Sequence, residues 1–325
     1  MDRLSNQSEK KTKKIVVTPY NPDWPGIFEI EALKIKDVLG ANCLAVHHIG
    51  STSVPGLLAK PVIDMIGVVK NPETAIKSLE TLGFKYKGEY NIPMRYYFNR
   101  AEGVDTNLHV YQEGHPEIEL NLLFRDYLRS HPKAREEYAA LKKSLLKEKS
   151  SYEKNNSAFT GYNLGKDAFI RKILKAAKYD RIRIMKCAHY AEWDFAKRLR
   201  QKYFFGPQSI SDPYTWTFDH KDHVHLILYQ GVELIGYAHI QFWPDQRAAL
   251  RIFVIDEPHR HHGFGSLFLS LCEQWLKKQG IRSLHDEARP DTLNFYRKNG
   301  YSEMSFGDPS GEPSSPQDVA MGKTL

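Results

Sequence analysis

The chain has 325 residues, of which 41% are hydrophobic and 26% are charged, and its formal net charge is +7. This composition is typical of a globular protein, and the length suits two domains that each bury a core. No apolar stretch is as long as a membrane span, and the start of the chain lacks the apolar core of a signal peptide, so we expect a cytoplasmic protein without a membrane partner. Three scattered cysteines argue against a disulfide framework.

Residues 1–15 form a basic tail, and a first domain is predicted over 16–179 and a second over 180–325. Two patterns define this boundary. Residues 166–179 have the periodicity of a closing helix, and the apolar and basic residues of 181–187 alternate as in the first strand of a new domain. The positive excess is divided between the tail and one helix face, which is typical of solvated surfaces. Nucleic acid is therefore not an expected partner, and the sequence does not indicate an oligomeric state.

The first domain contains the segment HHIGSTSVPGLLAKPVIDMIGVV over residues 47–69. A strand-like run leads into Gly50 and Ser51, and the next apolar strand carries Asp64 at its centre. A carboxylate in an apolar strand is costly unless it is paired or bound to a metal. Asp64 is therefore a candidate ligand-binding or metal-binding residue.

Three further motifs accompany this segment: YNPDWP, LNLLFRDYLRSHP and GYNLGKDAFI. Together they resemble the GrpB family, which belongs with the nucleotidyltransferase-fold proteins, and the resemblance extends over residues 16–177. It implies a mixed sheet with helices. In nucleotidyltransferases of this fold, a Gly-Ser pair lies under the triphosphate, and two carboxylates two positions apart on the next strand hold Mg²⁺.

Gly50, Ser51 and Asp64 match that spacing, but the position of the second carboxylate is occupied by Ile66. Because a single carboxylate holds Mg²⁺ poorly, we expect a domain that binds a nucleotide or another phosphate-bearing ligand with weak or no transfer activity. A scaffold or substrate-presenting role stays open, and Asp64 is the candidate magnesium ligand. The candidate binding residues are Gly50, Ser51, Ser53, Lys60, Asp64, Arg95, Arg125 and Arg129.

The second domain is predicted to be a mixed, mostly antiparallel sheet with helices on both faces, so the chain as a whole is of the α+β or α/β class. The expected elements are a strand at 181–187, a helix at 191–204, strands at 223–229, 234–243 and 248–256, a helix from about Gly263, a strand at 283–288 and a helix at 292–299.

The loop between the third of these strands and the next helix has the form R-x-x-G-x-G, from Arg260 to Gly265. The first turn of a helix has backbone N–H groups without internal partners and a partial positive charge, so it favours an anion. Gly263 and Gly265 have no Cβ atoms and let a phosphate approach the backbone. Arg260 can contribute a bidentate guanidinium. The loop therefore predicts a phosphate or pyrophosphate site.

This loop and the later motif LNFYRKNGY resemble the GNAT N-acetyltransferases over residues 181–325. The resemblance implies a strand that splays from its neighbour and pairs with the pantetheine arm of acetyl-CoA. It also implies that Tyr296 protonates the departing thiolate. One departure is Arg289, which replaces an asparagine of many members. The residues implied in acetyl-CoA binding are Phe253, Val254, Ile255, Arg260, His261, His262, Gly263, Phe264, Gly265 and Ser266.

An acceptor amine must lose a proton before it attacks a thioester, and Glu287, Asp256 and Asp219 are the candidate bases. Asp219 and Asp222 favour a cationic amine on a small molecule or a protein. The aromatic residues predicted to line its pocket are Tyr214, Trp216, Phe218, Phe242 and Trp243.

The histidines of the H-x-x-H-x-H pattern, His220, His223 and His225, have no cysteine or fourth ligand nearby, so zinc is not expected. The sequence thus favours an acetyl-CoA-dependent N-acetyltransferase with an attached GrpB-like domain. The alternatives are a regulatory protein that binds nucleotide and acetyl-CoA without turnover, and a bifunctional acetyltransferase and nucleotidyltransferase.

Overall fold

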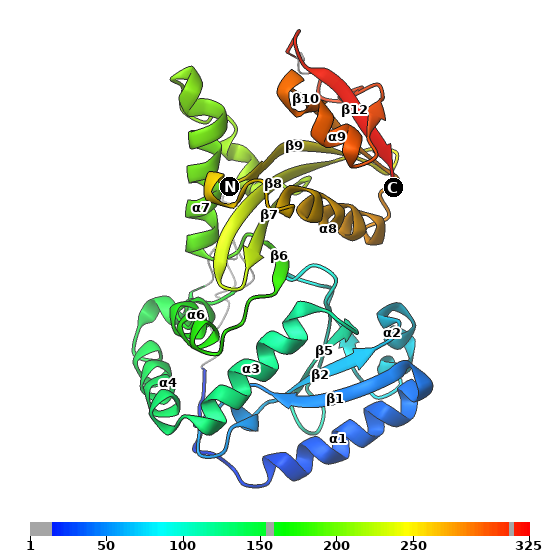
Figure 1. Ribbon diagram of the computed structural model, residues 1–325. Helices are drawn as coiled ribbons and strands as arrows, with labels where there is room; N and C mark the ends of the chain where they lie inside the picture. The colour runs from blue at the N-terminus through cyan, green and yellow to red at the C-terminus, as the bar shows by residue number, and fades with distance from the viewer. Residues whose placement is uncertain (1–14, 154–158, 312–314) are drawn as a thin grey trace, which may run out of the picture. The chain divides into compact units, whose positions relative to one another are not determined.

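A computed structural model describes residues 15–153, 159–311 and 315–325 (Figure 1). The predicted basic tail lies outside the described residues except for its last position. The chain forms two compact units, and the main change from one to the other falls between Ala177 and Lys178. Two short segments of the first half, Tyr86–Tyr97 and Gly114–Glu117, belong to the second unit, so the units are not contiguous in sequence.

The first unit contains a five-stranded sheet in the order β1-β2-β5-β4-β3, with β1 antiparallel to β2 and β2 parallel to β5. Helix α1 packs on β1, and the side chain of Asn71 caps α2 by accepting from the amides of Glu73 and Thr74. The strands are β1 (Cys43–Ile49), β2 (Ile63–Val69), β3 (Lys85–Tyr86), β4 (Tyr96–Arg100) and β5 (Thr106–Gln112). The helices are α1 (Trp24–Leu39), α2 (Pro72–Glu80), α3 (Pro116–Ser130), α4 (Pro132–Leu145), α5 (Gly161–Leu164) and α6 (Asp167–Ala176).

Gly50, directly after β1, has a φ of +69°, and a Cβ atom built there would lie 2.5 Å from Oδ2 of Asp64. Gly50→Ala should therefore lower the melting temperature by several degrees, since it adds a steric clash to an unfavourable backbone conformation. Gly56→Ala is the matched control, because Gly56 has a φ of +77° and its nearest neighbour would be 4.0 Å from the added atom. Equal melting temperatures of the two variants in thermal unfolding would show that the clash with Asp64 costs nothing.

The second unit contains a seven-stranded sheet in the order β11-β12-β10-β9-β8-β7-β6. Its neighbouring strands pair antiparallel except for the parallel contact of β9 with β10. The strands are β6 (Ile182–Lys186), β7 (His223–Gln230), β8 (Glu233–Trp243), β9 (Arg247–Ile255), β10 (Ser283–Ala288), β11 (Ser302–Glu303) and β12 (Val319–Thr324). The sequence analysis missed β12, which pairs with β10 along its whole length.

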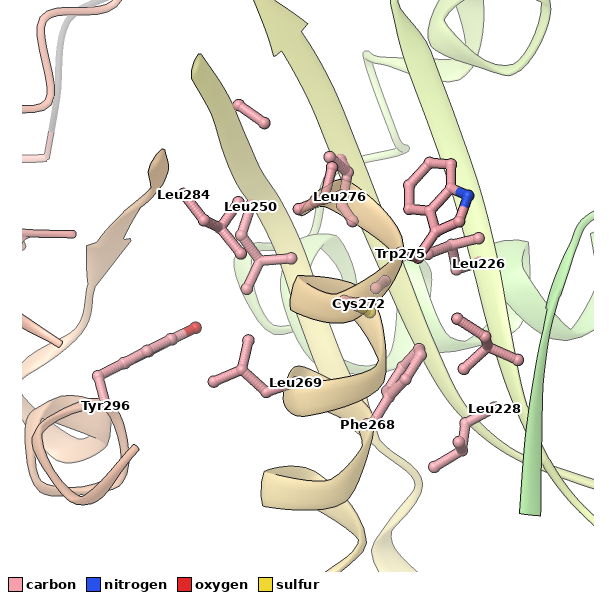
Figure 2. Packing of buried hydrophobic residues seen from close by; sticks show 14 of the residues in the cluster. Leu226, Leu228, Leu250, Phe268, Leu269, Cys272, Trp275, Leu276, Leu284 and Tyr296 are labelled. Atoms are coloured by element: carbon pink, nitrogen blue, oxygen red, sulfur yellow. The ribbon is translucent and has the colours of Figure 1, made fainter. Parts of the chain in front are cut away.

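Helices cover both faces of this sheet. In β7, Leu226 and Leu228 pack in the cluster with α8, whereas the alternate residues Ile227 and Tyr229 pack in the cluster with α7. Figure 2 shows the α8 side of this core, with Trp275 beside the strands. The helices are α7 (Tyr190–Arg200), which continues as a π-helical turn (Gln201–Phe205), α8 (Phe264–Lys278) and α9 (Leu293–Lys298). The mixed α and β architecture predicted for both halves is confirmed.

Short 3₁₀ turns connect several of these elements, and one of them forms the loop that leads toward α8. They span Gly40–Asn42, Ser51–Ser53, Lys149–Tyr152, Gly206–Gln208, Thr215–Asp219, Glu257–His259 and Pro290–Thr292. In the part of the chain that the structure describes, no helix is both long enough and apolar enough for a bilayer crossing.

Candidate active site

The two central parallel strands of the second unit separate along their length. β9 pairs with β10 only at Arg247, Ala248 and Ala249, opposite residues 283–285. Beyond these pairs, β9 continues to Ile255 and stays paired with β8 on its other side. Residues 250–255 therefore have one edge that faces β10 without a registered strand pair.

A β-bulge lies at the point where this separation begins. His239 is opposite Ile252 and the next residue of β8, Ile240, is opposite Leu250, so Arg251 is the extra residue of β9. Such a bulge bends its strand and increases the local twist, which turns the last residues of β9 away from β10. The Arg251 guanidinium is held on one side by Gln241 and Asp308, so the bulge is fixed by side chains as well.

The loop after β9 ends in a helix start that suits an anion. Gly263 is the N-cap of α8 with a φ of +81°, and the first helical hydrogen bond runs from the amide of Leu267 to its carbonyl. The amides of the intervening residues have no acceptor within the helix. A Cβ atom on Gly265 would lie 3.1 Å from the ring of Phe295, so the absence of a side chain there lets the loop approach α9. His261, His262 and Ser266 are exposed around this turn.

Arg260 was expected to direct its guanidinium at a phosphate, but it makes contacts within the protein instead. Its Nε donates to the carbonyl of Ile255 at 2.9 Å, and its guanidinium lies 4.5 Å from the ring centroid of Tyr203. The side chain therefore ties the loop back to the end of β9. Arg260 is exposed as a residue, and a guanidinium has further N–H donors that an anion can use.

A cavity of about 430 Å³ opens beside the separated strands. It brings together Phe253 of β9, Glu287 of β10 and Tyr296 of α9, which were predicted from the sequence. Arg289 also lines it and forms an ion pair with Asp291 at 3.4 Å. Of the predicted aromatic lining, Tyr214 and Trp216 contribute, whereas Phe218, Phe242 and Trp243 are absent from the lining.

Tyr296 is buried, with 6% of its surface exposed, and is hydrogen-bonded to Asp286. Figure 2 shows its ring extending from α9 toward the sheet and α8. Burial raises the pKa of Asp286 to about 8, against the effect of the Tyr296 hydrogen bond, and the neighbouring Glu287 and Asp318 carboxylates raise it further. Burial and Asp286 also raise the pKa of Tyr296. The two side chains therefore form a buried acid pair on the cavity wall.

The sequence analysis missed Asp286. The signal was present, because Leu284, Asp286 and Ala288 share one face of β10 and both hydrophobic members are buried. As at Asp64, a carboxylate in a row of buried apolar residues is costly unless it has a partner, so it marks a candidate functional residue.

Among the three candidate bases, only Glu287 lines the cavity. Asp256 accepts from Tyr203, Lys202 and Arg198, and these hydrogen bonds hold its pKa below the usual value although burial raises it. Asp219 is exposed and absent from the cavity lining. Asp222 is half-buried and also absent from the lining, so the acidic lining comes from β10 and from Asp318 instead.

The first unit brings most of its predicted site residues around the turn after β1. Asp64 accepts from Asn107 Nδ2 at 2.8 Å, and Lys142 Nζ donates to Ser51 Oγ at 3.0 Å. Lys60 and Lys166 both act electrostatically on Asp64. The sequence analysis missed Lys142 and Lys166, which lie far from the Gly-Ser motif in sequence.

The predicted arginines contribute to backbone contacts. Arg125 donates to the carbonyl of His48 at 3.0 Å, and Arg129 donates twice to the carbonyl of Ser53. Both line a second cavity of about 290 Å³ together with Ser53. Arg95 makes separate contacts, since it donates to the carbonyl of Glu89 and packs over tyrosine rings of its own segment.

The surroundings of Asp64 do not fit Mg²⁺. Its neighbour on the parallel strand is the amide of Asn107, and Ile66 is fully buried in the core. Two lysines act on the single carboxylate and make the surroundings positive, whereas a divalent cation requires negatively charged ligands. Within residues 15–153, 159–311 and 315–325, no group of three or more His, Cys, Asp or Glu residues could hold a metal ion.

Comparison with known proteins agrees with this two-part organisation. Residues 14–176 match the GrpB protein family. The chain belongs to the GrpB family. Residues 193–301 match the acetyltransferase (GNAT) family, so the GrpB domain is followed by a GNAT domain, as the sequence motifs predicted.

Three relatives illustrate the two matches. UPF0157 protein YqkA of Bacillus subtilis is 39% identical over 170 residues, which cover 51% of this chain and 48% of YqkA, so the match spans about half of that protein. GrpB from Enterococcus faecalis is 38% identical, covering 50% of this chain and 96% of that one at a TM-score of 0.43. A GNAT-family acetyltransferase from Staphylococcus aureus is 17% identical, and the match covers 45% of this chain and 99% of that one at a TM-score of 0.38.

Proposed function

We propose that the GNAT domain is an acetyl-CoA-dependent N-acetyltransferase. The observation that carries the proposal is the separation of β9 from β10, which leaves residues 250–255 with an edge open to a ligand. The anion-binding start of α8 follows at the end of that edge, and the cavity with Tyr296 lies beside it. A long ligand with a pyrophosphate at one position and an amide-containing arm at another is complementary to this arrangement.

The geometry supports a direct transfer. In the proposed reaction, Glu287 removes a proton from the ammonium form of the acceptor, and the amine attacks the thioester carbonyl. The tetrahedral intermediate loses its second nitrogen-bound proton to water and expels the thiolate, which takes a proton from Tyr296. Asp286, hydrogen-bonded to Tyr296, carries a proton at neutral pH because of its raised pKa and can replace the one that the phenol gives up.

The phosphate loop can be tested by binding alone. Arg260→Ala should weaken acetyl-CoA binding about tenfold in calorimetry, because it removes a charged hydrogen-bond donor and the contact that holds the loop against Ile255. Lys277→Ala is the control, since it removes the same charge from the opposite end of α8. Equal affinities of the two variants would contradict the loop assignment.

A sensor without turnover is the alternative for this domain. Release of CoA with a panel of small-molecule and peptide amines separates the two functions. Tight acetyl-CoA binding with no CoA release from any amine would favour the regulatory alternative over the acetyltransferase.

We also propose that the GrpB domain binds a phosphate-bearing ligand near Ser51. The supporting observation is an excess of lysines over carboxylates: Lys60 and Lys166 act on the single, half-buried Asp64, and Lys142 Nζ contacts the Ser51 hydroxyl and acts on Lys166. Burial and Lys166 lower the pKa of Lys142 to about 7, and burial and Lys60 lower that of Lys166 to about 8. A bound phosphate would restore the protonated form of both amines.

Pyrophosphate and metal-free ATP are suitable probes for this site. Binding should take up protons between about pH 7 and 8, which calorimetry detects as a dependence of the binding enthalpy on the buffer. Lys166→Met should weaken binding at least tenfold, whereas the exposed Lys175→Met should not. Binding without proton uptake, or with equal affinity in both variants, would place the anion elsewhere.

A further inference from the structure

Two hydrogen-bond chains begin at one buried arginine beneath the cavity. Arg200, the last residue of α7, is 0% exposed and is paired with Asp212 through Nε at 2.5 Å and Nη2 at 2.8 Å. Its remaining nitrogen, Nη1, contacts Tyr237 Oη at 3.3 Å and His239 Nδ1 at 3.2 Å. Because a guanidinium only donates, it fixes the direction of both chains.

The first chain is complete within the protein. Tyr237 Oη accepts from Arg200 and lies 2.7 Å from His225 Nδ1, to which it donates. The other nitrogen of His225 then carries the proton and donates to the carbonyl of Thr217 at 3.1 Å. This chain ends on a backbone acceptor, so its role is to hold the loop over the sheet.

The second chain has no acceptor at its end. His239 Nδ1 accepts from Arg200, so the proton of the neutral ring is on Nε2, which donates to His223 Nδ1 at 2.7 Å. Burial lowers the pKa of His223 to about 4, with His220 and Arg251 acting in the same direction, so its ring is neutral near pH 7. Its proton is then on Nε2, which is buried and has no hydrogen-bond partner among the described residues.

The opposite tautomer of His223 is disfavoured by the same chain. A bare Nε2 would require a proton on Nδ1, which would force His239 to carry its own proton on Nδ1, facing the Arg200 donor. Two donors cannot form a hydrogen bond. His223 therefore holds a buried N–H group beside the cavity that the residue lines, and it does not act as a base there.

We infer that the acceptor substrate is an amine that also carries a carboxylate or carbonyl oxygen, and that His223 Nε2 donates to this oxygen. This inference rests on the proposed acetyltransferase function, in which the acceptor is the amine that receives the acetyl group. A buried N–H without a partner is costly, and an oxygen of the ligand removes that cost. Arg251 also lines the cavity and acts electrostatically on His223, although the ion pair with Asp308 offsets its charge.

The opposite wall of the cavity is suited to the amine. Glu287 and Asp318 line it beside the protonated Asp286, so their carboxylates receive the ammonium while the imidazole receives the oxygen. Trp216, 53% exposed, packs edge-on against His223 at 5.2 Å between ring centroids. An oxygen that reaches Nε2 displaces this indole, and an aromatic or aliphatic substrate body replaces its contact.

The tautomer can be measured without turnover. In full-length protein labelled with ¹⁵N-histidine, long-range ¹⁵N correlation spectra report which ring nitrogen carries the proton, and His223→Gln assigns the signal. We expect Nε2–H at pH 7, with a shift on addition of L-phenylalanine and none with phenethylamine, which lacks the carboxylate. A bare Nε2, or the same response to both compounds, including none, would overturn the inference.

Kinetics with the same pair gives a second readout. His223→Leu should lower kcat/KM for the carboxylate-bearing amine at least tenfold more than for phenethylamine, and His223→Gln, which keeps an N–H donor, should restore part of that difference. If both amines lost activity equally, His223 would be structural. Failure of the wild-type protein to bind acetyl-CoA would instead reject the proposed function, while the tautomer result would stand independently.

Discussion

Tyr296→Phe should slow acetyl transfer about 100-fold without weakening acetyl-CoA binding. Tyr296 lines the cavity and is the proton donor of the proposed reaction, and loss of a positioned general acid typically costs a factor of this size. The ring itself packs in the core with Phe295 and Tyr301, and phenylalanine preserves that packing. Stopped-flow or steady-state CoA release gives kcat, and calorimetry gives the affinity.

Tyr301→Phe is the matched control for this experiment. Tyr301 is a second buried tyrosine of the same cluster, with ring centroids 5.4 Å from Tyr296, but it does not line the cavity. Its variant should keep kcat within about twofold. Equal losses in both variants would mean that the hydroxyl groups support the fold and that Tyr296 is not the acid.

Asp286→Asn should stabilise the protein at neutral pH. The folded protein holds the pKa of Asp286 at about 8, whereas the unfolded chain has the ordinary carboxyl value near 4. Between these values the folded state binds a proton that the unfolded state lacks, so stability falls as pH rises through the window and is constant above it. Asparagine removes this dependence, and we expect a rise in melting temperature of several degrees at pH 7 to 8.

The difference between wild type and variant should grow from pH 5 to pH 8 and then level off. The exposed Asp291→Asn should show no such trend, because its side chain is 70% exposed. A pH-independent difference for Asp286→Asn would contradict the raised pKa. Turnover offers a second measurement: wild-type activity should decline above about pH 8, when the ionised carboxylate holds the Tyr296 proton, and the variant should lose this decline.

The elements of the second unit were largely predictable because each has a local signal. The alternation in β7 and β8 reflects burial on two faces, and the glycine-bearing turn before α8 reflects the geometry of a helix start. The pairing of β12 with β10 has no such signal, since residues 319–324 acquire their place only from the sheet. The same holds for the two segments of the first half that join the second unit.

Side-chain networks were the least predictable part of the site. The H-x-x-H-x-H pattern was weighed only as a zinc site, because its partners Arg200, Tyr237 and His239 lie on other elements of the fold. Contacts between residues that are far apart in the sequence produce no characteristic spacing that a motif search could detect. The lysines near Asp64 escaped detection for the same reason, since α4 and the start of α6 supply them.

The separation of β9 and β10 has a consequence for solubility. An unpaired strand edge usually invites another chain to add a strand, which is the first step of edge-to-edge aggregation. Here the open edge lies inside the sheet, between two strands that are joined at Ala248 and Ala249 and that each have a second partner. A narrow, single-chain ligand can enter the gap between the two strands, whereas an incoming β-strand would have to break the existing pairs between β9 and β10. The protein can thus leave main-chain donors and acceptors free for a ligand without displaying a template for self-association.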